Sequence, residues 1–257
     1  MKFENLLVPE KDNPGDLTLS EDAGVRYLHF GTRWIQGAMS LTRPDDLVLS
    51  YTQQMMAWLL FEQPQTIQRM AILGLGAGGL VRFCHKHVSQ AHIDVVEINE
   101  QVTAMCHAFF RLPNSEKIHI IHANAEEWVN EKTQLKQYDL LLVDLYDEHA
   151  QGPSCSSINF YQGCFQSLNE QGIFVVNLFG NHESFDKNME NIVSAFGENY
   201  ILMPEVDEGN VVVIAFKGEQ LNLSVGGLLE RAGQLKKKYR FPALQWVKGV
   251  LSNLGEK

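Results

Sequence analysis

Short apolar runs alternate with longer amphipathic stretches between Arg69 and Lys217, and this alternation most constrains the fold. The runs are rich in Val, Ile and Leu without regular polar alternation, which is typical of strands buried on both faces. They are Met70–Gly74, Ile93–Ile98, Ile118–His122, Tyr138–Asp144, Gly172–Leu178 and Asn210–Phe216. The helix-like segments between them are Leu80–Ser89, Glu100–Arg111, Glu126–Lys132, Asn159–Asn169 and Ser184–Gly197. Alternating β and α segments predict a doubly wound, mostly parallel sheet with helices on both faces.

Smaller appendages are expected on either side of this region. Two short strands joined by a turn and then a helix precede it, and two helices follow it. These segments are Val25–Phe30, Trp34–Leu41, Ser50–Phe61, Leu223–Tyr239 and Leu244–Leu251. The last two are too short for a second catalytic domain. We therefore expect a β-hairpin region over 1–50, a nucleoside-binding α/β domain over 51–218 and a helical extension over 219–257.

Composition and charge exclude several classes of function. The chain has 257 residues and a formal net charge of -10, from 31 acidic and 21 basic side chains. Nucleic-acid affinity rests largely on contacts of Lys and Arg with phosphate, so this balance argues against a nucleic-acid partner. Apolar stretches such as Met55–Phe61 are too short to span a bilayer, and the N-terminus lacks the apolar region of a signal peptide. A cytoplasmic protein without a membrane partner is expected.

The cysteines and histidines predict no metal site. The four cysteines form neither a CxxC pair nor a zinc spacing, so we expect reduced structural thiols. His85 and His87 would diverge on a helix, and His119 and His122 would diverge on a strand.

The first buried run leads directly into the loop GLGAGG, Gly74–Gly79, and then into a helix. Glycines let the backbone turn sharply and approach a ligand closely. The helix N-terminus adds free N–H groups and the positive end of a dipole. Glycine-rich turns between a strand and a helix also occur where the glycines only allow close packing. Because this loop follows the first buried strand and opens a helix, we expect Gly74, Gly76 and Gly78 to contact a nucleoside.

The second buried run ends at Glu97, and this carboxylate supports nucleoside binding. At the tip of the second strand it can accept hydrogen bonds from both hydroxyls of a ribose. After the third run, HANAEEW (His122–Trp128) supplies small and amide residues where an adenine can lie flat. We therefore expect Asn124 and Ala125 to contact the base.

Two kinds of nucleoside are compatible with the glycine loop. Gly74, Gly76 and Gly79 also satisfy GxGxxG, so NAD is an alternative ligand. A dehydrogenase usually needs a second mononucleotide half and a sizeable substrate domain, and only about 40 residues follow Lys217. The final run, Asn210–Phe216, fits a last strand inserted antiparallel, as in S-adenosyl-sulfonium-binding folds. An adenosyl sulfonium is favoured over NAD.

Two carboxylates follow the fourth buried run. Asp144 and Asp147 come at the end of LLLVDLYDEH, and the fourth strand of such a sheet lies next to the first. Ligands bind outside the carboxyl ends of the strands, so Asp144 should lie beside the glycine loop. From spacing alone, both acids could also cap the loop that follows.

These motifs resemble those of spermidine synthases, the aminopropyltransferases that use decarboxylated S-adenosylmethionine. The resemblance covers roughly Trp34–Phe216. WIQGAMSLTRPDD is similar to the family's hairpin segment with its cofactor-contacting Gln, here Gln36. LSYTQQM resembles the family's Ser-Tyr-Gln-Glu-Met helix start, which implies that Tyr51 lies near the substrate.

The strand motifs continue the resemblance. ILGLGAGGLVRFCHKH is similar to the family's glycine motif, and VVEINEQV to its ribose-binding strand with Glu97. YDLLLVDLYDEHAQGP resembles the family's Asp-Ser-Ser-Asp-Pro segment, with Asp144 and Asp147 at its acidic positions. The resemblance implies that Asp144 is the catalytic base and that Tyr51 and Asp147 bind the substrate.

Several positions depart from the family pattern. Ala77 replaces an Asp of the glycine motif that meets the cationic aminopropyl end, and Ala123-Asn124 replaces Gly-Asp. The Gln after the fifth strand corresponds to Asn177, and Glu148 replaces a Pro. The segment Pro204–Asn210 has no clear counterpart of the family's tyrosine. The cofactor scaffold is therefore retained while the end that holds amine groups is altered.

The resemblance implies the class I S-adenosylmethionine-dependent methyltransferase-like Rossmann fold with a seven-stranded sheet. It also implies an aminopropyltransferase that takes decarboxylated S-adenosylmethionine as co-substrate, acts on a small cationic amine and forms a homodimer through the N-terminal hairpin. Two alternatives stay open: a methyltransferase that uses S-adenosylmethionine on a small molecule, and a non-catalytic member that retains nucleoside binding.

Overall fold

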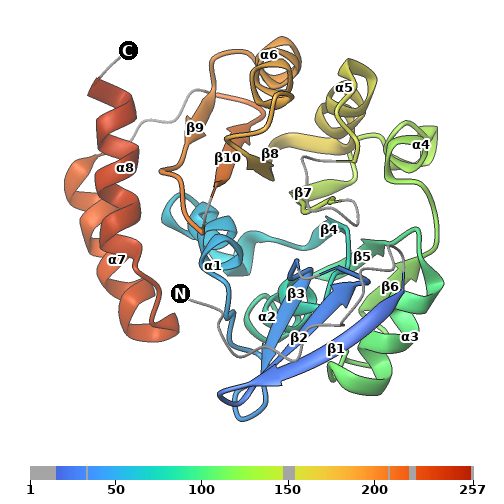
Figure 1. Cartoon of the computed structure of the whole chain (residues 1–257). Helices are drawn as coiled ribbons and strands as arrows, with labels where there is room; N and C mark the ends of the chain where they lie inside the picture. The colour runs from blue at the N-terminus through green and yellow to red at the C-terminus, as the bar shows by residue number, and fades with distance from the viewer. Residues whose placement is uncertain (1–15, 33, 147–153, 208, 220–223, 256–257) are drawn as a thin grey trace.

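The computed structural model describes residues 16–32, 34–146, 154–207, 209–219 and 224–255. Its centre is a seven-stranded sheet in the order β6-β5-β4-β7-β8-β10-β9 (Figure 1). The strands are β4 (Arg69–Leu73), β5 (His92–Val96), β6 (Ile118–Ile121), β7 (Tyr138–Val143), β8 (Leu168–Phe179), β9 (Tyr200–Leu202) and β10 (Asn210–Phe216). The first five are parallel, and β10 pairs antiparallel with β8 and β9. The predicted doubly wound sheet and its antiparallel last strand are confirmed.

Helices cover both faces of this sheet because neighbouring strand residues point to opposite sides. The helices are α1 (Ser50–Met55), α2 (Gly79–His87), α3 (Glu100–Phe109), α4 (Ala125–Val129), α5 (Ile158–Ser167), α6 (Phe185–Phe196), α7 (Val225–Tyr239) and α8 (Ala243–Gly255). Met70 and Ile72 share one apolar cluster with α1, α2, α3, α7 and α8. Ala71 and Leu73 face a second cluster with α4, α5 and α6. Figure 1 shows α7 and α8 side by side, away from α4 to α6.

The N-terminal region contains the expected hairpin, β2 (Val25–Phe30) paired with β3 (Gly37–Ser40), and one further strand, β1 (Leu17–Asp22). Together they form a three-stranded antiparallel sheet. The turn between β1 and β2 is Ala23-Gly24, where both residues have positive φ, 47° and 77°. Such turns match the twist of paired strands. The segment 34–36, expected to be strand, lies outside β3.

Boundaries elsewhere lie within a few residues of those expected. The helix expected over 50–61 is α1 followed by a 3₁₀ helix, Met56–Leu60. The strand β9 was not predicted; it pairs with β10 at the sheet edge through three residues. No helix in the described part of the chain is long and apolar enough to cross a membrane.

Three of the expected site residues follow neighbouring parallel strands. β4 pairs with β5 on one side and with β7 on the other. Gly74, Glu97 and Asp144 each come directly after one of these strands. Because parallel strands end at the same edge of a sheet, the topology brings the three residues together.

Candidate active site

The glycine loop connects β4 to α2 through three residues in the left-handed region. Gly74, Gly76 and Gly78 have backbone φ angles of 93°, 49° and 69°, which residues other than glycine rarely adopt. A Cβ at Gly74 would overlap the carbonyl oxygen of Asp144, and one at Gly76 would lie 2.8 Å from the carbonyl oxygen of Gln36. The loop is therefore packed between the end of β7 and the segment that leads into β3.

Glu97 is bound to this loop. Its Oε2 accepts the Leu75 backbone N–H at 3.0 Å, and its Oε1 accepts that of Asn99 at 2.8 Å. Burial raises the pKa of the Glu97 carboxyl, and the two backbone N–H groups oppose this rise. Each oxygen still has a lone pair, so the carboxylate can accept two further hydrogen bonds, as a ribose requires.

Asp144 holds its carboxylate between two donors. Tyr51 Oη donates to Oδ2 at 3.3 Å, and Asn177 Nδ2 donates to Oδ1 at 3.1 Å. Burial raises the pKa of the Asp144 carboxyl to about 6, although both hydrogen bonds act to lower it. A carboxylate with a pKa near the working pH is suited to accept a proton.

Tyr51 reaches Asp144 from the first turn of α1. Its backbone N–H, which has no partner within a helix that starts at Ser50, donates to Asp207 Oδ2 at 2.8 Å. Burial and the nearby Asp144 carboxylate raise the pKa of the Tyr51 phenol well above its usual value. The phenol is therefore a hydrogen-bond donor in this arrangement and remains protonated.

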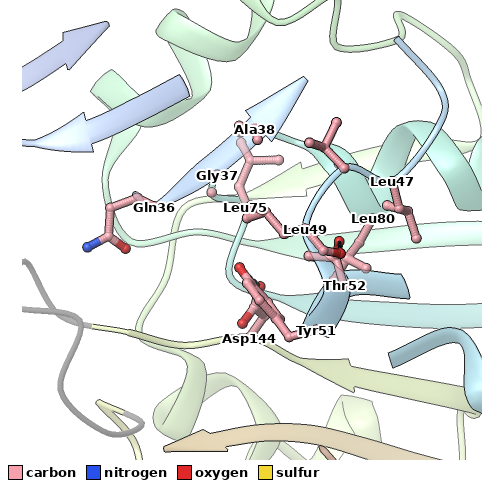
Figure 2. A pocket seen from close by; sticks show the side chains of 14 residues that line it. Gln36, Gly37, Ala38, Leu47, Leu49, Tyr51, Thr52, Leu75, Leu80 and Asp144 are labelled. Carbon is pink, nitrogen blue, oxygen red and sulfur yellow. Dashed lines mark hydrogen bonds between the residues drawn. The ribbon is translucent and has the colours of Figure 1, made fainter. Parts of the chain in front are cut away.

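A pocket opens between these groups and the N-terminal sheet (Figure 2). Figure 2 shows Tyr51 and Asp144 side by side, with Gln36 across from them. The lining is otherwise made of glycines and small or apolar side chains, with Thr52. These residues are Gly37, Ala38, Leu47, Val48, Leu49, Leu75, Gly76, Ala77, Gly79 and Leu80. Asp144 is the single charged side chain among the described residues that line the pocket.

Ala77 lies in the pocket wall. Its side chain is 3% exposed, and the backbone of Gly37 at the start of β3 packs directly against it. The position where the resembling family carries an acid is therefore an apolar contact between the glycine loop and the N-terminal sheet. This leaves Asp144 without a second described carboxylate in the pocket lining.

Asn124 and Ala125 lie where β6 gives way to α4. Asn124 Oδ1 accepts the backbone N–H groups of Glu126 and Glu127 at 2.9 and 3.2 Å, so it caps the helix. Its side-chain oxygen is therefore committed to the helix N-terminus. Asp147, expected to bind the substrate, lies outside the described residues.

The sequence did not predict that residues of the neighbouring strands β8 and β10 form hydrogen bonds around Asp144. Asn177 on β8 was noted as a departure from the family pattern, and here it touches Asp144 directly. Asn210, the first residue of β10, and Asp207, from the segment before it, complete the same hydrogen-bond network. Their place at the start of the final strand was the one available signal. Among the described residues, no cluster of three or more His, Cys, Asp or Glu side chains is arranged to hold a metal ion.

The sheet order, the glycine loop and Glu97 together define the class I S-adenosylmethionine-dependent methyltransferase-like fold. Residues 49–224 match the spermine/spermidine synthase domain model. The chain belongs to the spermine/spermidine synthase family. This family membership confirms the resemblance found in the motifs.

Relatives and similar structures are consistent with this family membership. The polyamine aminopropyltransferase of Neisseria meningitidis is 32% identical over 236 residues, which cover 91% of this chain and 88% of that protein. That of Chromobacterium violaceum is 30% identical over 239 residues, or 92% and 90% of the two chains. A probable spermidine synthase from Corynebacterium glutamicum has a TM-score of 0.71 at 17% identity over 84% of this chain and 83% of its own. A spermidine synthase in complex with the transition state analogue AdoDATO has a TM-score of 0.65 at 17% identity over 93% and 90%.

Proposed function

We propose that this protein is an aminopropyltransferase that moves an aminopropyl group from decarboxylated S-adenosylmethionine to a di- or polyamine. The polyamine aminopropyltransferases among its relatives support this activity. The structural observation that carries it is Asp144: an acid of raised pKa, and the single charged side chain among the described pocket-lining residues.

The charge of the pocket favours a decarboxylated donor. Decarboxylated S-adenosylmethionine carries a sulfonium and an ammonium group but no carboxylate. The carboxylate of ordinary S-adenosylmethionine would find no Lys or Arg among the described lining residues and would lie near Asp144. Like charges within a few ångströms in a partly buried site cost about 1 to 4 kcal/mol. This difference supports transfer of an aminopropyl rather than a methyl group.

The other expected residues are proposed to hold the nucleoside end of the donor. In the proposal, Gly74, Gly76 and Gly78 approach the sulfonium side and Glu97 accepts the ribose hydroxyls. Gln36 contacts the donor from the segment that leads into β3, and Asn124 and Ala125 contact the adenine. Asp147 is proposed to hold an amine beside Asp144.

The reaction is an in-line displacement. The lone pair of the acceptor nitrogen forms a bond to the propyl carbon next to the sulfur. The carbon–sulfur bond breaks, its electron pair stays on sulfur, and neutral methylthioadenosine leaves without protonation. The product nitrogen, now bonded to the propyl carbon, remains a secondary ammonium, so the one proton released is the one that the acceptor gives up before the attack. Tyr51 and Asp144 can orient the amine, and orientation of two reactants in a closed site supplies much of the acceleration.

Asp144 accepts the proton in this scheme. Alkyl amines have a pKa of about 10.4 in water, so at neutral pH the acceptor must give up a proton before its lone pair is free. Asp144 is ionised above about pH 6 and lies beside the glycine loop, where the sulfonium is expected. A carboxylate in this place can take the proton and hold the resulting amine.

A homodimer in the cytoplasm is also part of the proposal. Contact through the sheet β1-β2-β3 rests on the family resemblance, and sedimentation equilibrium of the purified protein measures the oligomeric state.

Calorimetry with three ligands tests the proposed function. Decarboxylated S-adenosylmethionine, S-adenosylmethionine and methylthioadenosine are titrated into the protein, and product formation is followed with 1,4-diaminobutane and spermidine as acceptors. Preference for the decarboxylated donor with transfer to an amine supports the proposal. Preference for S-adenosylmethionine favours a methyltransferase, and binding of none of the three contradicts both.

A further inference from the structure

Asn210, the first residue of β10, is joined to Asp144 by a chain of side chains. Asn210 Oδ1 accepts a hydrogen bond from Asn177 Nδ2 at 3.0 Å. The same Nδ2 donates to Asp144 Oδ1 at 3.1 Å. The two strands are antiparallel neighbours, with Asn210 opposite Phe179 and Asn177 opposite Val212. The two asparagines are thus diagonal neighbours on adjacent strands, within side-chain reach.

The hydrogen bond from Asn210 to Asp207 fixes the direction of the other hydrogen bonds in this series of side chains. Asn210 Nδ2 donates to the carbonyl oxygen of Asp207 at 3.0 Å, and a carbonyl oxygen can only accept. This contact sets the Asn210 amide with its Oδ1 toward Asn177. An acceptor in that place requires the NH₂ group of Asn177, not its carbonyl oxygen, to point toward both Asn210 and Asp144.

The Asn177 amide is buried, so water cannot replace the hydrogen bonds that would be lost if the amide turned over. The side chain is 1% exposed, and its Nδ2 uses both protons, one for Asn210 and one for Asp144. Its Oδ1 is buried and has no hydrogen-bond partner in the described part of the chain. If the amide rotated, this oxygen would face the Asp144 carboxylate, and two acceptors would meet at low dielectric.

We propose that Asn210 is a positioning residue for Asp144: acting through Asn177, it keeps a donor on Oδ1 of the carboxylate and so fixes the carboxylate toward the pocket. The role of Asp144 as base rests on the proposed function. The effect of Asn210 on the carboxylate itself does not, because the hydrogen bonds exist without any ligand.

The segment that carries Asn210 also reaches the opposite side of the same carboxylate. Asp207 accepts the backbone N–H of Tyr51, whose phenol donates to Asp144 Oδ2. Two described ionisable groups interact with Asp144: Tyr51 from α1 and Tyr146 after β7. Asp207 influences Asp144 through its hydrogen bond to Tyr51. Asn177 and Tyr51 both act to lower the Asp144 pKa against burial. Loss of the Asn177 donor should raise it above about 6.

A double-mutant cycle separates positioning from a general structural role. We expect Asn210→Ala and Asn177→Ala each to lower kcat/KM by about tenfold or more, and the double variant to be no worse than Asn177→Ala alone. The control is Asn199→Ala, which removes a hydrogen bond of 3.1 Å to the carbonyl oxygen of Phe216 at the far end of β10. It should leave kcat/KM within about twofold.

A ligand-free measurement keeps the inference independent of activity. The Asp144 carboxyl ¹³C resonance is assigned with Asp144→Asn and followed against pH in the wild type and in the Asn210→Ala, Asn177→Ala and double variants. Asn210→Ala should move the titration midpoint upward, with no further movement when it is added to Asn177→Ala. An unchanged midpoint in Asn210→Ala, or equal movements in both backgrounds, overturns the inference. Absence of aminopropyl transfer in a wild type that shows the expected titration would contradict only the proposed function.

Discussion

The phenol of Tyr51 donates to Oδ2 of Asp144 across 3.3 Å, joining the first turn of α1 to the end of β7. This contact stabilises the ionised carboxylate, whereas burial favours the protonated form and brings its pKa to about 6. The balance between the two sets the pH at which Asp144 can accept a proton.

The aminopropyl-transfer activity should fall at acidic pH. Because Asp144 must be ionised to act as base, kcat/KM for transfer should drop about tenfold for each pH unit below about 6. Tyr51→Phe should shift this limb to higher pH and lower the plateau by about tenfold. Tyr239→Phe on α7 is the matched control and should leave the profile in place. A pH profile that is flat from 5 to 8 in the wild type would count against Asp144 as the base.

Asp144→Asn should nearly abolish transfer. Positioned general bases contribute about 10²- to 10⁴-fold, so kcat should fall by at least about 10². Affinity for methylthioadenosine, measured by calorimetry, should stay within about twofold because this product carries no group for Asp144 to bind. Wild-type turnover in the variant would remove Asp144 from the catalytic step.

The same variant should be more stable than the wild type at alkaline pH. The folded-state pKa of Asp144, about 6, lies above the value of about 3.9 for an unfolded chain. The folded protein therefore binds this proton more tightly, and the wild type loses stability as pH rises from about 4 to 6. Allowing for partial exposure, Asp144→Asn should gain about 1 to 2 kcal/mol at pH 8, or about 3 °C in Tm. Calorimetric scans should show the gain shrinking toward pH 4.5; a gain that is constant with pH would have another origin.

Glu97→Gln should weaken nucleoside binding selectively. The amide retains one acceptor for a backbone N–H, but it replaces one carboxylate oxygen by a donor and removes the charge that a ribose diol favours. We expect affinity for methylthioadenosine to fall by about 10- to 100-fold. Glu100→Gln, an exposed residue in the first turn of α3, is the control and should bind like the wild type.

Gly74→Ala should be poorly tolerated, unlike Gly79→Ala. At Gly74 a Cβ would overlap the Asp144 carbonyl oxygen at a φ of 93°, whereas at Gly79 the nearest atom would be 3.7 Å away in a helix. Strain of this kind typically costs about 1 to 3 kcal/mol, and the forced overlap adds to it. Urea unfolding should therefore show a clear loss for Gly74→Ala and a change within about 1 kcal/mol for Gly79→Ala.

Local signals in the sequence predicted the parallel part of the sheet and the residues that follow its strands. Gly74, Glu97 and Asp144 were found because buried runs are recognisable and the topology of such sheets is restricted. The placement of Gln36 and Tyr51 came from family resemblance, since nothing in local pattern brings them to the glycine loop.

Contacts set by tertiary pairing were not predictable. β9 is three residues long and is defined by its pairing with β10. Asn and Asp are common in turns, so the residue types of Asn210 and Asp207 gave no signal. Their contacts depend on the antiparallel direction of β10, which places its first residue at the edge where the parallel strands end.

That reversed direction of β10 also bears on the order in which a growing chain can complete the pocket. The loop after β4 and the acid after β5 belong to neighbouring strands close in sequence, whereas Tyr51 and Asp207 are 156 residues apart. Contacts of such long range form late, because a large loop must close first. During synthesis the contact between the glycine loop and Glu97 can therefore form well before Asp207 is in place to hold Tyr51 beside the Asp144 carboxylate.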